Sequence, residues 1–286
     1  MSMLGYLVED EDLAAILRAR PIQTDTAGDV AVCICANRKE WKACLWALVS
    51  FYEFAQVKFP LVIYDDGTLS RSSHKVILEL FPNASIVDRR CADLIITRAL
   101  AEYPNCLRFR HEHPRARHTV DLPLLCGSRR ILMLDDGVLF VGLPERLLEN
   151  LRDYEPGQCV FGWGTGDSYA CSQKQIFERL GAKVGERVNC EIMLADISEF
   201  SYELLEQWLH RNEIKNHSWM EQTLWAIYAG RGRTVFLERK YDVTVCPTVQ
   251  PACFLKRFFR PLRKAIYSES ISRVRRELEN RGVFGR

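Results

Sequence analysis

The sequence predicts an α/β protein with a central, mostly parallel β-sheet. Short apolar runs alternate along the chain with segments in which apolar residues recur at helical spacing, and several of these runs end in a polar turn. This alternation implies βαβ units, in which crossover helices join parallel strands. The chain has 286 residues, of which 48% are hydrophobic and 27% charged, so it can bury a sizeable core.

The first half of the chain contains three strand–helix units. A peripheral segment, residues 1–28, precedes them, and within it residues 10–20 are expected to form a short helix that ends at Pro21. Asn37 is a candidate N-cap because it follows the first apolar run and precedes a helical pattern. The expected strands are residues 30–35, 60–64 and 85–87, and the expected helices are residues 38–54, 70–81 and 92–103.

The second half continues the pattern with shorter elements. Residues 111–118 are polar and contain Pro114, so no element is assigned to them. The expected strands are 130–134, one within 156–166, 188–195, 234–236 and 244–245, and the expected helices are 121–126, 144–151, 202–209 and 219–228. Residues 29–250 are therefore predicted to form one domain, followed by a basic amphipathic tail at 251–286 with a helix from about residue 261.

Charge and cysteine content narrow the function classes. The net charge is only +2, which argues against nucleic-acid binding, but residues 255–286 carry ten basic and three acidic side chains. That tail is either a solvated helix face or a peripheral membrane contact. Eleven cysteines, an odd number without regular spacing, together with an acidic N-terminus, favour free thiols and a cytoplasmic protein. No apolar run is long enough to span a membrane.

Two acidic turns are the candidate ligand site. Asp65-Asp66-Gly67 and Asp135-Asp136-Gly137 each follow a predicted buried strand. Because ligands of open parallel sheets bind beyond the carboxyl ends of the strands, both turns are expected to face one crevice. Acids there can accept hydrogen bonds from a base or a ribose, or bind a divalent cation. Acidic residues with glycine also simply make good turns, which is the competing interpretation.

The sequence resembles the GT-A glycosyltransferases in four segments. Residues 62–68 resemble the strand and turn at which an acid meets the nucleotide base, and residues 129–140, RRILMLDDGVLF, resemble the strand that ends in the DxD motif. Residues 189–194 resemble the later Asn-Ala-Gly strand, and residues 219–224 resemble a helix that starts with an acid and glutamine. The order and spacing of the segments agree with the family over residues 29–245.

The resemblance implies a GT-A fold and transfer of a sugar from a nucleotide diphosphate donor, expected to be a UDP-sugar, to an unidentified acceptor. It implies donor binding by Ala36, Asn37, Asp65, Asp66 and Asp135. The two aspartates after the second strand would contact the nucleoside, and Asp135 would contact the ribose or a metal. The implied candidate bases are Glu191 and Glu221, whose order of preference stays open.

The metal-binding motif departs from the family pattern. Asp135 takes the position of the first DxD acid, whereas Gly137 takes that of the second. Asp136 falls between them, where an extended backbone turns its side chain away. Mn²⁺ or Mg²⁺ would then be held weakly by Asp135 and Asp136. Other departures are Glu191 in place of glycine, His118 in place of lysine, and the absence of histidine after His217.

Three alternatives stay open from the sequence. Basic side chains, with Arg129, Arg130 and the tail arginines as candidates, could neutralise the diphosphate without metal. The chain could keep the fold as a binding or scaffold protein without turnover, or act as a nucleotidyltransferase. The histidines at 111, 113 and 118 are a weaker candidate metal cluster, because they lack the usual zinc companions.

Overall fold

A computed structural model describes residues 10–113, 115–164, 169–211, 219–237, 254–255 and 263–284. A seven-stranded sheet with the order β3-β2-β1-β4-β7-β6-β8 lies at its centre. Only β7 runs antiparallel to its neighbours, so the predicted mostly parallel α/β fold is confirmed. The strands of this sheet are β1 (Val30–Ala36), β2 (Leu61–Asp65), β3 (Ser85–Val87), β4 (Arg130–Leu134), β6 (Gln158–Trp163), β7 (Val188–Asp196) and β8 (Arg233–Phe236).

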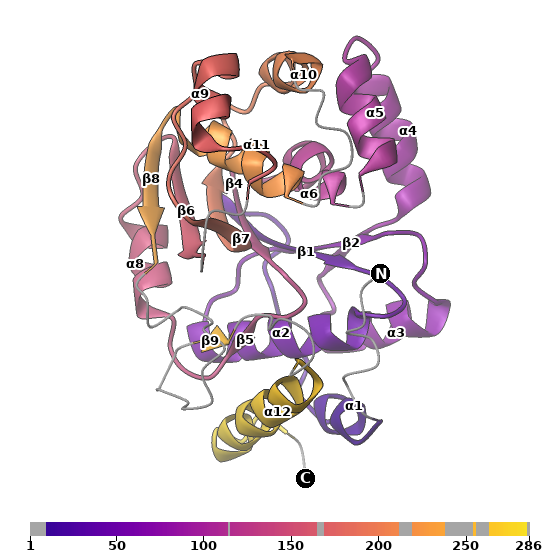
Figure 1. Cartoon of the computed structure of the whole chain (residues 1–286). Coiled ribbons are helices and arrows are strands. Elements are labelled where there is room, and N and C mark those ends of the chain that lie inside the picture. The colour runs from indigo at the N-terminus through magenta and orange to yellow at the C-terminus, as the bar shows by residue number, and fades with distance from the viewer. Residues whose placement is uncertain are drawn as a thin grey trace.

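Helices cover both faces of this sheet (Figure 1). One side carries α2, with α1 and α12 beyond it, and the other side carries α6 and α11 with the α4, α5 and α10 group. The described helices are α1 (Asp10–Ile16), α2 (Trp41–Ala55), α3 (Arg71–Leu80), α4 (Arg89–Ala99), α5 (Pro104–Glu112), α6 (Ala116–Val120), α7 (Leu122–Leu125), α8 (Glu145–Arg152), α9 (Gln173–Leu180), α10 (Tyr202–Arg211), α11 (Met220–Ala229) and α12 (Arg263–Asn280).

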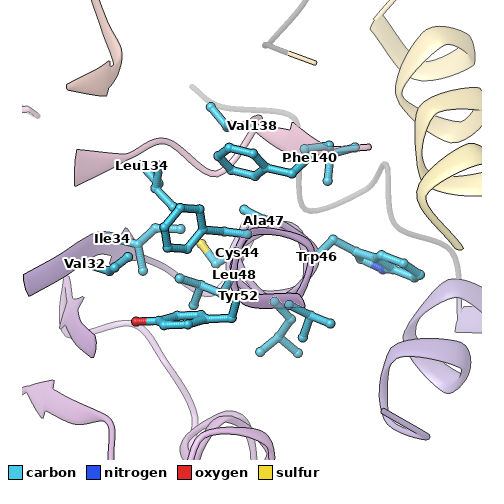
Figure 2. Close-up of a cluster of buried hydrophobic side chains, with 14 of the residues drawn as sticks. Val32, Ile34, Cys44, Trp46, Ala47, Leu48, Tyr52, Leu134, Val138 and Phe140 are labelled. Atoms are coloured by element: carbon cyan, nitrogen blue, oxygen red, sulfur yellow. The ribbon is translucent and has the colours of Figure 1, made fainter. Parts of the chain in front are cut away.

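The strands alternate their side chains between two apolar cores. Val32, Ile34 and Leu134 point to the α2 side, whereas neighbouring residues such as Cys33 and Met133 point to the α11 side. Figure 2 shows the α2 side, where side chains of β1 and β4 meet the helix and Trp46 points away from the strands. Burial on both faces explains why the strands read as continuous apolar runs in the sequence.

The C-terminal helix α12 packs on α2, opposite the sheet (Figure 1). Ile271, Val274 and Leu278 are fully buried there, at helical spacing. Beyond the helix, Phe284 pairs with Ala19 in an isolated antiparallel bridge and its ring contacts Trp46. A second small sheet forms where β9 (Phe254–Leu255) pairs antiparallel with β5 (Leu139–Phe140).

Several element boundaries differ from the sequence prediction. Helix α2 begins at Trp41 and its N-cap is Glu40, so Asn37 is not the cap. The Asn37 Oδ1 instead accepts a hydrogen bond from the backbone N–H of Lys39 at 2.8 Å, in the turn before the helix. Helix α4 begins at Arg89 instead of Ala92 because the Asp88 side chain caps it. Helices α5 and α6 occupy the segment that appeared only polar, α9 was not predicted, and the expected strand 244–245 lies outside the described residues.

Two further expectations concern the cysteines and membrane spans. The cysteines within the described residues are all free thiols. Burial raises the pKa of several of them, for example that of Cys159 to about 12, so they stay protonated and act as small apolar side chains. Among the described helices, none combines the length and apolarity that a membrane crossing requires.

Candidate functional site

The predicted site residues lie at the carboxyl edge of three adjacent strands. Ala36 ends β1, Asp65 ends β2, and Asp135 directly follows β4, with β1 between the other two. Ala36 pairs with Asp65, and the backbone N–H of Asp66 donates to the Ala36 carbonyl at 3.1 Å. Two strand spacings place the acidic turns about 10 Å apart across β1. The fold therefore brings the first-strand residues and both acidic turns to one edge.

The turn after β2 is built around Asp65. Its buried carboxylate accepts from the backbone N–H groups of Gly67 at 2.8 Å and Leu69 at 3.2 Å, and its other oxygen lies 2.9 Å from His74 Nε2. Gly67 has φ +89°, a conformation that favours glycine. Asp65 is thus already engaged in shaping the turn, which leaves the half-buried Asp66 as the more accessible acid.

Hydrogen bonds join the turn after β2 to the loop after β1. The Asp66 Oδ1 accepts from the Thr68 backbone N–H at 2.9 Å, and Thr68 Oγ1 in turn accepts from the Arg38 backbone N–H at 2.8 Å. This chain of hydrogen bonds ties the loop after β1 to the loop after β2. Both loops are consequently held in fixed positions at the strand ends.

A cavity opens beside the β2 turn. It has a volume of about 610 Å³ and is lined by Asp65, Gly67, Leu69, Arg71, His74, Asp88, Arg89, Arg90 and Asp93. This size is within the range of small-molecule sites. Its lining mixes basic and acidic side chains, which suits a polar ligand better than an apolar one.

The two acids of the β4 turn differ in their surroundings. Asp135 continues the β4–β7 ladder, with its backbone N–H donating to the Glu191 carbonyl at 2.8 Å, and its carboxylate points to the α6 side. Asp136 is buried and raises the pKa of the Cys44 thiol on α2, second to burial of that thiol. Asp136 also contributes to the raised pKa of Arg115, so both carboxylates act on the same arginine.

Asp135 belongs to a group of four ionisable side chains on the α6 side. The Arg115 guanidinium, directly before α6, lies 3.5 Å from Asp135 Oδ2 and 3.5 Å from Glu221 Oε2 on α11. His118 on α6 pairs through Nδ1 with the other Glu221 oxygen. We call Asp135, Arg115, Glu221 and His118 the ionic quartet.

The quartet members hold one another in their charged forms. Asp135 foremost, with Glu221, raises the pKa of Arg115. Burial alone would lower the His118 pKa, but Cys35 and Glu221 raise it well above 6.5. Burial alone would raise the Glu221 pKa, but His118 and Arg115 lower it below its ordinary value. Arg115, His118 and Glu221 are therefore held in their charged forms.

A buried network fixes the segment that carries Arg115 and His118. The Arg110 guanidinium on α5 contacts both oxygens of Asp121 at 2.7 and 2.8 Å, and the Tyr64 hydroxyl on β2 donates to Asp121 at 2.6 Å. Arg110 also pairs with Asp93 on α4 at 2.7 Å. This network ties α5, α6 and α7 to the sheet, so the quartet has a rigid support.

Glu191 is the predicted acid that stays more open. It lies on β7 beside Asp135 and is half-buried, and it contributes to raising the Arg115 pKa after Asp135, Glu221 and Asp136. Glu221, by contrast, is 3% exposed and engaged with two cations. The two candidate bases therefore flank the same arginine with very different accessibility.

The described residues do not fit a divalent cation. Asp135 already pairs with Arg115, and Gly137 supplies no carboxylate. No group of three or more His, Cys, Asp or Glu side chains in the described ranges could hold a metal. His113 is buried, stacks on Phe109, and accepts from the Arg115 backbone N–H at 3.2 Å, so it serves structure. The predicted Mn²⁺ or Mg²⁺ has no built site here.

Two arginines suggested by the sequence lie elsewhere. Arg129 and Arg130 stand at the amino end of β4, the edge opposite Asp135, and pair with Asp196 and Asp29. They cannot reach a ligand at the carboxyl edge, so this sequence-based candidate assignment is wrong for both. The arginine that does lie at the site, Arg115, was missed. Its spacing of three from His118 places both on one helical face, but the sequence alone does not show what that face meets.

Comparisons with solved structures identify the fold as GT-A. The chain is similar to the galactosyltransferase LgtC in complex with donor and acceptor sugar analogues, with a TM-score of 0.56 and 16% identity over 89% of this chain and 100% of that one. Mouse xyloside xylosyltransferase 1 in its apo form gives a TM-score of 0.52 and 14% identity over 77% and 89% of the two chains. The glycosyltransferase GlyE of Streptococcus pneumoniae TIGR4 gives a TM-score of 0.52 and 12% identity over 90% of this chain and 64% of that one.

Comparisons by sequence add nothing to this fold-level likeness. No family model matches the chain, and no curated protein matches it. At these identities, the structural likeness establishes the GT-A fold, and the predicted fold class is confirmed.

Proposed function

We propose that the chain is a glycosyltransferase that uses a sugar activated by a nucleoside diphosphate, with a UDP-sugar as the expected donor. The observation that carries the proposal is the ionic quartet around Asp135, built at the carboxyl edge of a GT-A sheet. Ligands of such sheets bind at this edge. The half-exposed Arg115 lies there beside the acid that follows β4.

The donor would lie across the ends of β2, β1 and β4. Its nucleoside would bind at the β2 end, near Asn37 and Asp66 and beside the 610 Å³ cavity, with Ala36 forming the floor. Its diphosphate would reach the quartet at Asp135. The separation of about 10 Å between the two turns suits a ligand whose two polar ends are recognised separately.

The chemistry then needs charge stabilisation and a base. Departure of a nucleoside diphosphate leaves negative charge, which preorganised cations stabilise. Glu191 is the better candidate base because its side chain is more accessible. Glu221 has a lowered pKa and two cationic partners, so it acts as a positioning residue for Arg115 and His118. No step is assigned to a metal ion.

The acceptor and any membrane contact belong to the same proposal. LgtC was solved with an acceptor sugar analogue, so we propose a hydroxyl-bearing acceptor that enters beside Glu191. The predicted membrane contact belongs to the basic tail at residues 251–286. Residues 258–262 lie outside the described ranges, and the apolar face of α12 from residue 271 onward is occupied by α2.

The test is nucleotide binding followed by a turnover screen. UDP and GDP are titrated by calorimetry, and release of the nucleoside diphosphate from UDP- and GDP-sugars is then measured. We expect UDP binding and slow sugar-nucleotide turnover, lost in Asp135→Asn and kept in Glu178→Gln, an exposed acid on α9. Binding without turnover would leave a binding protein, and failure to bind either nucleotide would exclude the donor site.

A further inference from the structure

Arg115 lies between the Asp135 and Glu221 carboxylates. Its guanidinium contacts the Asp135 carboxylate on one side and the Glu221 carboxylate on the other, both at 3.5 Å. We propose that Arg115 is the resident cation of this site and binds the donor diphosphate directly, without a divalent metal. The inference rests on the proposed function, because it names how that donor site holds its ligand.

The charge balance of the quartet supports this assignment. A divalent metal site gathers carboxylates whose negative charge the metal neutralises. Here Arg115 pairs with both Asp135 and Glu221, and His118 pairs with Glu221, so basic side chains already compensate these two carboxylates. A metal ion that entered would have to displace the guanidinium from Asp135, and Gly137 offers no second carboxylate to replace that contact.

Exposure separates Arg115 from a purely structural arginine. The Arg115 side chain is 39% exposed, whereas its partners Asp135 and Glu221 are 13% and 4% exposed. Arg110, five residues earlier, is 2% exposed and contacts its acids at 2.7 Å. A guanidinium carries five N–H donors, more than two ion pairs of 3.5 Å occupy, so Arg115 can also donate to phosphate oxygens.

The position of Arg115 is fixed from behind. Its backbone N–H donates to His113 Nδ1 at 3.2 Å, and its helix is anchored through Asp121 to the buried Arg110. Glu221, held in turn by His118, restrains the guanidinium. This preorganisation favours diphosphate binding because little side-chain freedom remains to be lost.

The experiment measures anion binding with and without metal. Inorganic pyrophosphate, UDP and GDP are titrated by calorimetry into the full chain in excess EDTA and again with Mn²⁺. The variants are Arg115→Gln, Arg115→Lys and the double variant Arg115→Gln/Gly137→Asp. Arg117→Gln is the matched control, because Arg117 is on the same helix but lies over the Tyr64 ring. Thermal unfolding checks that each variant folds.

We expect the wild-type protein to bind pyrophosphate and UDP in EDTA, with little change on adding Mn²⁺. Arg115→Gln should weaken this binding about ten- to hundredfold, the range for losing a charged hydrogen bond. Arg115→Lys should restore part of it, because lysine keeps the charge without the planar donors. The double variant should bind UDP only with Mn²⁺, and Arg117→Gln should match the wild type.

Two outcomes would overturn the inference. One is wild-type UDP binding that requires Mn²⁺, and the other is a folded Arg115→Gln variant with unchanged affinity in EDTA. Pyrophosphate binding that depends on Arg115, without any preference for UDP or GDP, would uphold the inference and reject the proposed function. Failure of the wild type to bind all three probes in both conditions would reject both.

Discussion

Two arginines five residues apart illustrate how position decides the role of the same side chain. Arg110 and Asp121 are both removed from water and satisfy each other at hydrogen-bond distance, with Tyr64 completing the network. Arg115 faces carboxylates at longer range and keeps access to solvent. In the sequence both are basic residues in a polar segment. Only the packing of α5 and α6 shows that Arg110 stabilises the fold and that Arg115 lies at the candidate site.

Removing Arg110 should destabilise the whole fold. In Arg110→Met the carboxylate of Asp121 stays buried without its cation, and breaking such a pair costs about 3–5 kcal/mol. Urea unfolding followed by circular dichroism measures this free energy. Arg108→Met, at an exposed position on the same helix, is the control. The double variant Arg110→Met/Asp121→Leu should recover much of the loss, and a single variant as stable as the control would contradict the role assigned to this pair.

The pair of His118 and Glu221 should make stability depend on pH. The folded-state pKa of His118 is raised, so its contribution is complete below 6.5 and is lost as the pH rises through the raised value. The folded-state pKa of Glu221 is lowered, so its contribution is complete above 4.5 and is lost as the pH falls through the lowered value. Both contributions are therefore complete between pH 4.5 and 6.5.

Urea unfolding of the wild type and of His118→Gln over a pH series tests this dependence. The variant should lose most stability relative to the wild type inside that window, and the difference should shrink above it as the wild-type histidine deprotonates. His111→Gln is a suitable control, because His111 is an exposed histidine on α5. A stability difference that stays constant from pH 5 to pH 9 would show that folding does not shift the pKa of His118, and this would contradict the assigned pair.

At the scale of elements, strands were easier to predict than the helices around the site. Buried strands such as β1 and β4 are continuous apolar runs bounded by polar turns, and this local pattern is sufficient. Helices α5 and α6 carry few apolar residues, because part of their buried side is the ionic network of Arg110 and Asp121. Hydrophobic periodicity has little signal there. Helix α9 has a capping box at Ser172 and Gln175, a signal that was present but not used.

The end of α11 depends on close backbone contact at Gly230. A Cβ at this position would lie 1.8 Å from the carbonyl oxygen of Lys183, so the two segments would have to separate. Gly230→Ala should therefore destabilise the protein by about 1–3 kcal/mol, the range for overpacking. Gly142→Ala is the control, since its Cβ would meet no atom within 4 Å. Thermal unfolding of both variants measures the difference, and equal stabilities would disprove the close approach.

At the scale of the molecule, the alternation of strands and helices was enough to predict a mostly parallel sheet, but not the direction of β7. Nothing in the local pattern of β7 distinguishes it from the parallel strands, although it runs antiparallel between β4 and β6. The convergence of Arg115, Asp135 and Glu221 likewise depends on packing α6 and α11 against the sheet. The acids were predictable from strand ends, whereas their cation was not, because contacts distant in sequence leave no local signal.

The C-terminal helix is part of the core, and this makes its apolar face a test of the whole architecture. Val274 on α12 is fully buried in the apolar core that α12 shares with α2, while Arg276 on the same helix is exposed. Val274→Asn removes buried apolar surface and places an amide in an apolar site, so it should lower the free energy of unfolding by about 2–4 kcal/mol. Arg276→Asn introduces the same residue at the surface, where the change should stay within about 0.5 kcal/mol.

Because α12 packs on α2 and α2 packs on β1 and β4, the loss in Val274→Asn should appear in a single cooperative transition of the whole fold. Urea unfolding followed by tryptophan fluorescence reports this directly, since Trp46 lies beneath the C-terminal segment and contacts Phe284. A tail that only rests on the surface would instead detach first, at low urea, and leave the main transition of Val274→Asn equal to that of Arg276→Asn. That pattern would remove α12 from the folding unit of the sheet.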